Sequence, residues 1–202
     1  MIKIGITGGI GSGKSVVASL LSIKGIPVYE ADQAGKELSD RSPEIREKLI
    51  ALFGEDIYIE HVLDRKKLAS VIFSDDEALQ KVNETIHPVV AKDFLDWLSG
   101  VSQPICAIES AILFESGFDH LVDVIWMVYA PVEIRMTRVM QRDGVTEADV
   151  IKRMNRQTPD DVKRKRADFV IINDDVQAVI PQVDEYIEIL SNIKLTTDER
   201  RN

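Results

Sequence analysis

The chain has 202 residues, 45% of them hydrophobic, and its 34 acidic and 25 basic side chains give a formal net charge of −9. This length suits one α/β core with an inserted subdomain or lid. The acidic balance disfavours a general role in binding nucleic acid, which needs a basic surface. The single cysteine, Cys106, lies in an apolar run, so we expect a buried thiol without a disulfide, as fits a reducing compartment.

No segment of the sequence has the features of a membrane or secretion signal. No apolar run approaches the roughly 20 residues of a membrane span. The apolar start, residues 1–6, is too short for a signal peptide. We expect a soluble cytoplasmic protein, with no membrane, nucleic-acid or obligate protein partner.

The first 30 residues show the pattern of a βαβ unit. Ile2–Thr7 is a short apolar run that leads into glycines, as a buried strand does. Ser15–Lys24 has helical spacing, and Gly25 followed by Pro27 predicts its end. Ile26–Tyr29 reads as a second strand, which completes the unit.

The stretch 34–100 has a different character, because it is charged and mostly helical in its pattern. Glu44–Phe53 and Glu77–Trp97 read as helices, and Asp56–Val62 as a local hairpin. The stretch is too long for a simple crossover between strands. We therefore predict an inserted helical subdomain.

Buried-strand patterns resume after residue 100. Continuous apolar runs at Ile105–Ile108, Val124–Tyr129 and Phe169–Ile172 are typical of parallel strands covered on both faces. Ala148–Arg156 and Val176–Ile193 read as helices. The predicted fold class is α/β, with a five-stranded parallel sheet.

Gly8–Ser15 matches the phosphate-binding pattern G-x-x-x-x-G-K-[ST] between a strand and a helix. Its glycines let backbone N–H groups converge at the N-terminus of the helix, where an anion is favoured. Lys14 is placed to reach the β- and γ-phosphates, and the Ser15 hydroxyl to ligate Mg²⁺. The motif predicts ATP and Mg²⁺ as cofactors, with nucleotide-binding residues Gly8, Gly11, Ser12, Gly13, Lys14, Ser15 and Val16.

Three acidic residues are candidates for the chemistry. Asp32 follows the second strand, at the sheet edge where open α/β proteins bind ligands. There it would accept a proton from an attacking hydroxyl or hold the water shell of the metal; the alternative is a helix N-cap. Glu109 and Glu115 also fit a place near the metal, although Glu115 fits a first-turn helix acid or a surface charge equally well.

Residues 135–166 form the one basic stretch of the chain, with five interleaved acids. Three interpretations fit: a solvated helical hairpin, a patch for RNA, or a lid that supplies arginines to the transferring phosphoryl group. RNA binding is disfavoured because no aromatic residues interleave. We favour the lid, because Gly144 and Pro159 lie near its bends.

Other polar residues give no functional signal of their own. The three histidines lack metal-ligand spacing, and His87-Pro88 reads as the end of a helical run. Arg65 reads as a charge on a helix surface.

Taken together, residues 2–173 resemble the dephospho-CoA kinase family, with the motifs in the right order. Ile6–Ser15 is similar to the family's phosphate loop. Val28–Asp32 resembles its Asp-Ala-Asp segment, with Glu30 in place of the first Asp, and implies that Asp32 is the catalytic base. Leu63–Arg65 and Thr85–Pro88 resemble the substrate-domain motifs, which implies that Arg65 and His87 bind the acceptor.

The later motifs resemble the family as well. Leu113-Phe-Glu115 matches the end of a Pro-Leu-Leu-Phe-Glu pattern. Lys163 and Ala167-Asp168 resemble the segment that closes around adenine, together with Asn173. The lid pattern is matched at Arg138, Arg142, Arg153 and Gln157. The resemblance implies catalytic roles for Lys14, Asp32 and Arg142, and nucleotide binding by Arg138 and Asn173.

The resemblance implies that ATP phosphorylates the ribose 3′-hydroxyl of dephospho-CoA, the last step of coenzyme A synthesis. It also implies a P-loop kinase core at 1–33 and 101–202, a CoA-binding insert at 34–100 and a lid at 138–166. Two alternatives remain open: another nucleoside-monophosphate or small-molecule kinase of this fold, and a non-catalytic ATP-binding regulator.

Overall fold

The computed structural model describes residues 1–72 and 75–199, and for residues 193–199 it describes the backbone alone. Two compact units make up the chain. One consists of Met1–Val28 and Ser102–Asn202, and the other of Tyr29–Val101. Each unit has a hydrophobic core of its own.

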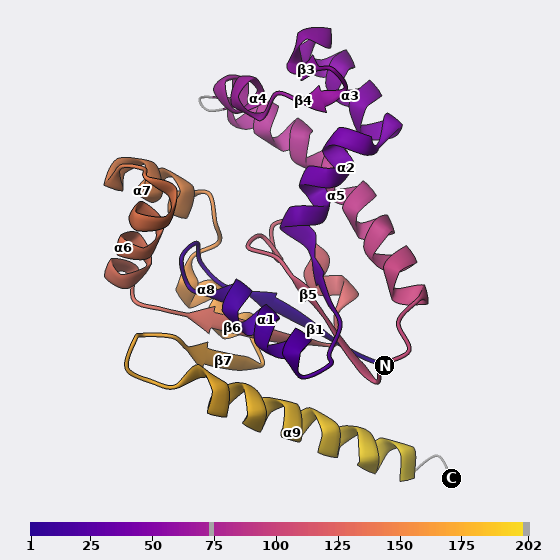
Figure 1. Ribbon diagram of the computed structural model, residues 1–202, viewed down its shortest axis with the longest axis vertical. Coiled ribbons are helices and arrows are strands. Elements are labelled where there is room, and N and C mark those ends of the chain that lie inside the picture. Colours follow the sequence, from indigo (N-terminus) through magenta and orange to yellow (C-terminus); the bar gives the residue numbers. More distant parts are fainter. Residues whose placement is uncertain (73–74, 200–202) are drawn as a thin grey trace. The chain divides into compact units, whose positions relative to one another are not determined.

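A five-stranded sheet is built from β1 (Ile2–Thr7), β2 (Val28–Glu30), β5 (Ile105–Glu109), β6 (Val124–Tyr129) and β7 (Phe169–Ile172). The strand order is β2-β5-β1-β6-β7. β1 pairs in parallel with β5 and β6, and β6 with β7, so the predicted parallel sheet is confirmed (Figure 1). Because the strands run parallel, their carboxyl ends share one edge.

Helices of the first unit follow these strands. They are α1 (Lys14–Ile23), the 3₁₀ helix η2 (Phe118–Leu121), α6 (Val132–Asp143), α7 (Glu147–Asn155), α8 (Asp160–Arg166) and α9 (Val179–Glu199). α1 and α9 contact each other, and Ile4, Ile6 and Trp126 are fully buried in the core they share with the sheet. Gly5 of β1 faces the opposite side of the sheet, where a Cβ would lie 3.0 Å from Leu113. The segment after β5 therefore covers that side of the sheet.

The second unit is helical with a small hairpin. Its elements are α2 (Ala31–Arg41), α3 (Pro43–Phe53), η1 (Glu55–Ile57), β3 (Tyr58–Ile59), β4 (Val62–Leu63), α4 (Arg65–Ile72) and α5 (Asp76–Ser99). Ile45, Leu49 and Ile57 are fully buried and form the centre of its core. The predicted hairpin is confirmed, and Glu60 and His61 turn it with φ of 48° and 73°.

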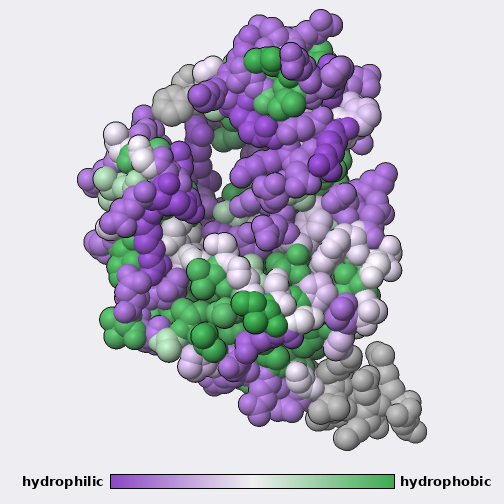
Figure 2. Space-filling model, viewed as in Figure 1, coloured by the Kyte–Doolittle hydropathy of each residue, from purple (hydrophilic) through white to green (hydrophobic). Residues whose placement is uncertain are grey.

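The face of the second unit that Figure 2 shows is mainly hydrophilic, with small hydrophobic areas. Exposed apolar side chains include Leu52, Ile59 and Val62. Single exposed apolar residues are normal on a soluble surface. Within residues 1–72 and 75–199, no helix combines the length and the apolar character needed to span a membrane.

The expected ends of two helices differ from the structure. His87-Pro88 does not end a helical run, because α5 continues through Pro88 to Ser99, close to the expected helix Glu77–Trp97. Proline removes one helical hydrogen bond, but buried residues on both sides of it, Val82 and Phe94, anchor the helix in the core of the unit.

The last helix runs from Val179 to Glu199, not from Val176 to Ile193. Asp174 explains the later start, because its Oδ1 accepts from the N–H groups of Val176 and Gln177 at 3.0 and 2.8 Å. This turn competes with helix formation. The remaining predicted elements agree with the structure to within about two residues, as such boundaries do.

Phe94 should be a main source of stability in the second unit. Its ring is fully buried and lies 5.3 Å from Tyr29 and 5.9 Å from Trp97, between centroids. We expect Phe94→Ala to lower the free energy of unfolding by about 3–5 kcal/mol. The control is Leu95→Ala on the exposed side of the same helix, where 51% of the residue is open to solvent, with an expected loss below about 1 kcal/mol. Equal losses in urea unfolding would contradict this account.

Candidate active site

The phosphate loop joins β1 to α1 with a tightly turned backbone. Gly13 is the N-cap of α1, with a left-handed φ of 94°. Its carbonyl accepts from the Val16 N–H at 3.0 Å, and the Gly9 carbonyl accepts from the Ser12 N–H at 3.0 Å. The N-terminus of α1 therefore follows directly on the glycines, which is the arrangement that binds phosphate.

Neighbouring atoms crowd all four glycines of the loop: Gly9 and Gly11 face Arg135, and Gly8 and Gly13 face the ends of two strands. A Cβ at Gly8 would overlap the carbonyl of Val128, and one at Gly13 would overlap the amide of Asn173. Asn173 comes directly after β7 and donates from Nδ2 to the Ser12 carbonyl at 2.8 Å. The ends of β6 and β7 thus define the shape of the loop.

Lys14 lies in this site beside an acid. Its Nζ is 4.0 Å from Glu109 Oε1, and both side chains are about one tenth exposed: 10% and 11%. Glu109 ends β5, and Ile6 of β1 is its partner in the sheet register. The Glu109 carboxylate offsets the positive charge of Lys14, as the phosphates of a bound nucleotide would also do.

Two arginines of α6 contact the loop region. Arg135 is 5% exposed; it donates from Nη2 to Asp160 Oδ2 at 2.5 Å and from Nε to the Ala130 carbonyl at 3.1 Å. Arg138 donates to the carbonyls of Gly11 and Asn173 at 3.4 and 3.1 Å.

Arg142 has different contacts. Its Nε lies 2.7 Å from Asp143 Oδ1, and its side chain is 63% exposed. Arg153 also bonds to Asp143, at 2.7 Å. The hydrogen bonds from Arg142 hold the pKa of the Asp143 carboxyl below its usual value, and the same pairing raises the pKa of Arg142. The structure therefore brings Arg138 and Asn173 to the phosphate loop, and describes no such contact for Arg142.

The model of the dephospho-CoA kinase family matches residues 2–178. The chain belongs to the dephospho-CoA kinase family. A dephospho-CoA kinase of Porphyromonas gingivalis is 46% identical over 189 residues, 93% of this chain and 94% of that one. One of Bacteroides fragilis is 45% identical, over 94% of this chain and 93% of the relative.

Solved structures share the fold of this chain. A Thermus thermophilus protein aligns with a TM-score of 0.80 at 35% identity, over 95% of this chain and 96% of that one. The dephospho-CoA kinase of Campylobacter jejuni has a TM-score of 0.66 at 24% identity, over 96% and 98%. A shikimate kinase of Acinetobacter baumannii, at 0.58 and 15% over 96% of each chain, shares the fold. The predicted P-loop kinase fold is confirmed.

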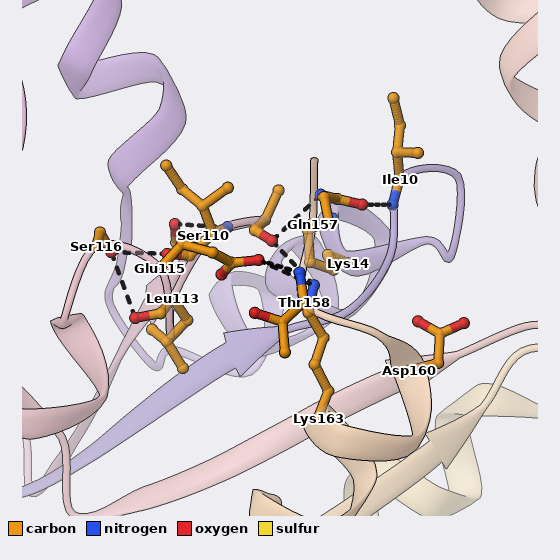
Figure 3. A network of polar contacts seen from close by, with 12 residues as sticks. Ile10, Lys14, Ser110, Leu113, Glu115, Ser116, Gln157, Thr158, Asp160 and Lys163 are labelled. Carbon is orange, nitrogen blue, oxygen red and sulfur yellow. Dashed lines mark hydrogen bonds and ion pairs between the residues drawn. The ribbon is translucent and has the colours of Figure 1, made fainter. Parts of the chain in front are cut away.

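This member of the dephospho-CoA kinase family has a polar network behind the phosphate loop (Figure 3). Lys163 of α8 is fully buried and donates from Nζ to the Ala111 carbonyl at 3.3 Å. Its Nζ also lies 4.0 Å from Glu115 Oε1. Burial lowers the pKa of Lys163, the Glu115 charge opposes that shift, and Lys14 adds to it.

The three residues expected to act on or bind the acceptor substrate all lie in the second unit. Asp32 is the second residue of α2 and is exposed; the N-cap of that helix is Glu30, so the N-cap interpretation of Asp32 is wrong. Arg65 donates from Nη2 to the Lys36 carbonyl and to Asp40 Oδ2, both at 2.7 Å. His87 lies inside α5.

Sequence reasoning did not single out the Arg135–Asp160 ion pair or the Ala111 carbonyl. The helix that holds Arg135 has many charged residues, so nothing in the sequence marks this arginine as the buried one. A backbone carbonyl is present in every residue, so the sequence cannot mark it either. The part of the chain that the structure describes contains no group of three or more His, Cys, Asp or Glu side chains able to hold a metal. Ser15 as the metal ligand stays a prediction.

Two glycine substitutions separate crowding from backbone strain. Gly13 and Gly25 have φ of 94° and 80°, but a Cβ at Gly25 would meet nothing within 4 Å. Each change to alanine should lower the free energy of unfolding by about 1 kcal/mol through strain. Gly13→Ala should also displace Asn173 and weaken ATP binding by at least about 10-fold, measured by calorimetry. Equal ATP affinities for the two variants would refute a crowded loop.

Proposed function

We propose that this protein transfers the γ-phosphoryl group of ATP to the ribose 3′-hydroxyl of dephospho-CoA, giving coenzyme A and ADP in the last step of coenzyme A biosynthesis. The observation that carries this proposal is the Lys14–Glu109 pair at the crowded phosphate loop of a chain that matches the family over residues 2–178.

Nucleotide binding follows from the first unit. The β- and γ-phosphates would meet the first N–H groups of α1 and the ammonium of Lys14. Lys14 then exchanges the Glu109 carboxylate, 4.0 Å away, for phosphate oxygens. Arg138 and Asn173 support this placement, because both hold the backbone of the loop and lie beside it.

Mg²⁺ fits the loop as a largely hydrated ion. Ser15 follows Lys14 in the first turn of α1 and is exposed, so its hydroxyl is accessible. Mg²⁺ keeps several waters and needs few protein ligands, which suits a site with one hydroxyl. When bound, the ion would neutralise charge on the β- and γ-phosphates.

Acceptor chemistry is assigned to the second unit. We propose that the Asp32 carboxylate takes the proton of the ribose 3′-hydroxyl and that Arg65 and His87 bind the acceptor. Arg142, which is exposed and paired with Asp143, is proposed to exchange that partner for the transferring phosphoryl group when residues 138–166 close as a lid.

The protein is further proposed to act in the cytoplasm on small molecules alone. Its net charge of −9 disfavours a nucleic-acid surface, and its single cysteine fits a reducing compartment.

An ADP-release assay with and without dephospho-CoA tests the function. We expect release that depends on dephospho-CoA and on Mg²⁺, and a product heavier by one phosphoryl group in the mass spectrum. Shikimate, nucleoside monophosphates and gluconate serve as competing acceptors. If one of these acceptors is phosphorylated faster than dephospho-CoA, that acceptor is the substrate. Slow hydrolysis of ATP without any phosphorylated acceptor would indicate a regulator.

Asp32→Asn tests the base. The amide preserves shape, so melting and ATP binding should not change, while kcat falls by roughly 10²- to 10⁴-fold. Glu77→Gln is the matched control, because Glu77 is the second residue of α5 as Asp32 is of α2. A carboxylate that acts on the metal's water shell would instead show partial recovery in excess Mg²⁺. Wild-type turnover at every Mg²⁺ concentration would exclude Asp32 from the chemistry.

Arg142→Ala tests the lid arginine. Because an exposed ion pair contributes about 0–1 kcal/mol to stability, melting should hardly change. Loss of charge stabilisation in the transition state should lower kcat by roughly 10²-fold. Arg41→Ala removes another exposed arginine, which is paired with Glu37 in the second unit, and should leave kcat unaltered. If the two variants have the same kcat, Arg142 is a surface charge.

A further inference from the structure

Gln157, between α7 and α8, connects two distant segments through one side-chain amide (Figure 3). Its Oε1 accepts from the N–H of Ile10 at 2.8 Å, and its Nε2 donates to the Ala111 carbonyl at 3.2 Å. Ile10 is the third residue of the phosphate loop, and Ala111 follows β5. Gln157 is half-buried, so both bonds are sheltered from competing water.

Two neighbouring contacts hold the same segments together. The Thr158 N–H donates to Glu115 Oε1 at 2.5 Å. Lys163 Nζ donates to the Ala111 carbonyl at 3.3 Å, so that one carbonyl oxygen accepts from both Gln157 and Lys163. An oxygen with two lone pairs can do so. We call these contacts the polar clamp; it consists of Gln157, Thr158 and Lys163 on one side and Ile10, Ala111 and Glu115 on the other.

Within the polar clamp, Gln157 has a different task from its neighbours. The Thr158 N–H and Lys163 Nζ donate to the segment after β5. Gln157 makes the further contact with the phosphate loop itself. That bond fixes the loop backbone between Gly9 and Gly11, because the direction of the Ile10 N–H is set by a side chain.

A neutral amide suits this position. Lys14, Lys163, Arg135 and Arg138 already place four cations around the loop. A carboxylate at residue 157 could still accept from the Ile10 N–H, but it would repel phosphates and could not donate to Ala111. The glutamine satisfies a backbone donor and a backbone acceptor and adds no charge.

We propose that Gln157 is a positioning residue for phosphoryl transfer, which acts through the backbone of Ile10 and couples the position of the α7–α8 connection to the shape of the phosphate loop. The inference rests on the proposed kinase function. It assigns to Gln157 no contact with either substrate.

Gln157→Met tests the inference, since methionine has a similar length and no amide. Gln182→Met is the matched control. Gln182 is also half-buried and also bridges backbone groups: it accepts from the Ile172 N–H at 2.8 Å and donates to the Ile172 and Ala178 carbonyls at 3.0 and 2.9 Å. Each variant loses one side-chain amide that connects backbone groups. Gln182, however, makes no described bond to the phosphate loop.

Steady-state kinetics of dephospho-CoA phosphorylation, corrected for the folded fraction, give the decisive comparison. We expect Gln157→Met to lower kcat by about 10- to 100-fold, the range for a misplaced reacting geometry. The KM for dephospho-CoA should change less than about 2-fold, because the contact is with the phosphate loop. Gln182→Met should lower the melting temperature by a similar amount and keep the wild-type kcat.

Each contrary result has a distinct meaning. If wild-type protein phosphorylates dephospho-CoA and Gln157→Met has the same kcat, the positioning role is wrong while the function stands. A kcat lowered equally in both glutamine variants would make Gln157 a structural residue like Gln182. If the wild-type protein does not use dephospho-CoA, the proposed function itself fails, whatever the variants do.

Discussion

The phosphate loop is constrained by contacts that leave no space for side chains, and much of the first unit serves this constraint. The Val128 carbonyl closes off the space at Gly8, and the Asn173 amide closes it off at Gly13. The loop is therefore formed against the ends of two other strands. Because β1, β6 and β7 run parallel, these ends come together at one edge of the sheet. A change in the register of either pair would alter the loop directly.

Charge at this edge follows the same logic. Lys14 is close enough to disfavour the charge of the fully buried Lys163, and Glu109 and Glu115 are the acids beside these two lysines. Buried charges persist when they are paired. The incoming phosphates would add negative charge to a site that already has the matching cations in place. This preorganisation is the main electrostatic means by which phosphoryl transfer is accelerated.

Sequence patterns predicted what depends on local chemistry. β1, β6 and β7 have the predicted bounds, because continuous apolar runs mark strands covered on both faces. The phosphate loop was found because a fixed spacing of glycines, lysine and serine has one structural outcome in this context. Features that depend on distant contacts were missed. The polar clamp, for example, depends on backbone groups that any residue carries.

The two tryptophans of the chain are divided between the two units, one in each. Trp126 of β6 is fully buried in the first unit, with the rings of Phe169 and Tyr186 at its edges. Trp97 of α5 is half-buried against Phe94 and Tyr29 in the second. The protein thus carries one intrinsic fluorophore in each unit. Replacing one tryptophan by phenylalanine leaves an optical probe of the other unit, so emission spectra can follow the melting of the nucleotide-binding core and of the helical insert separately.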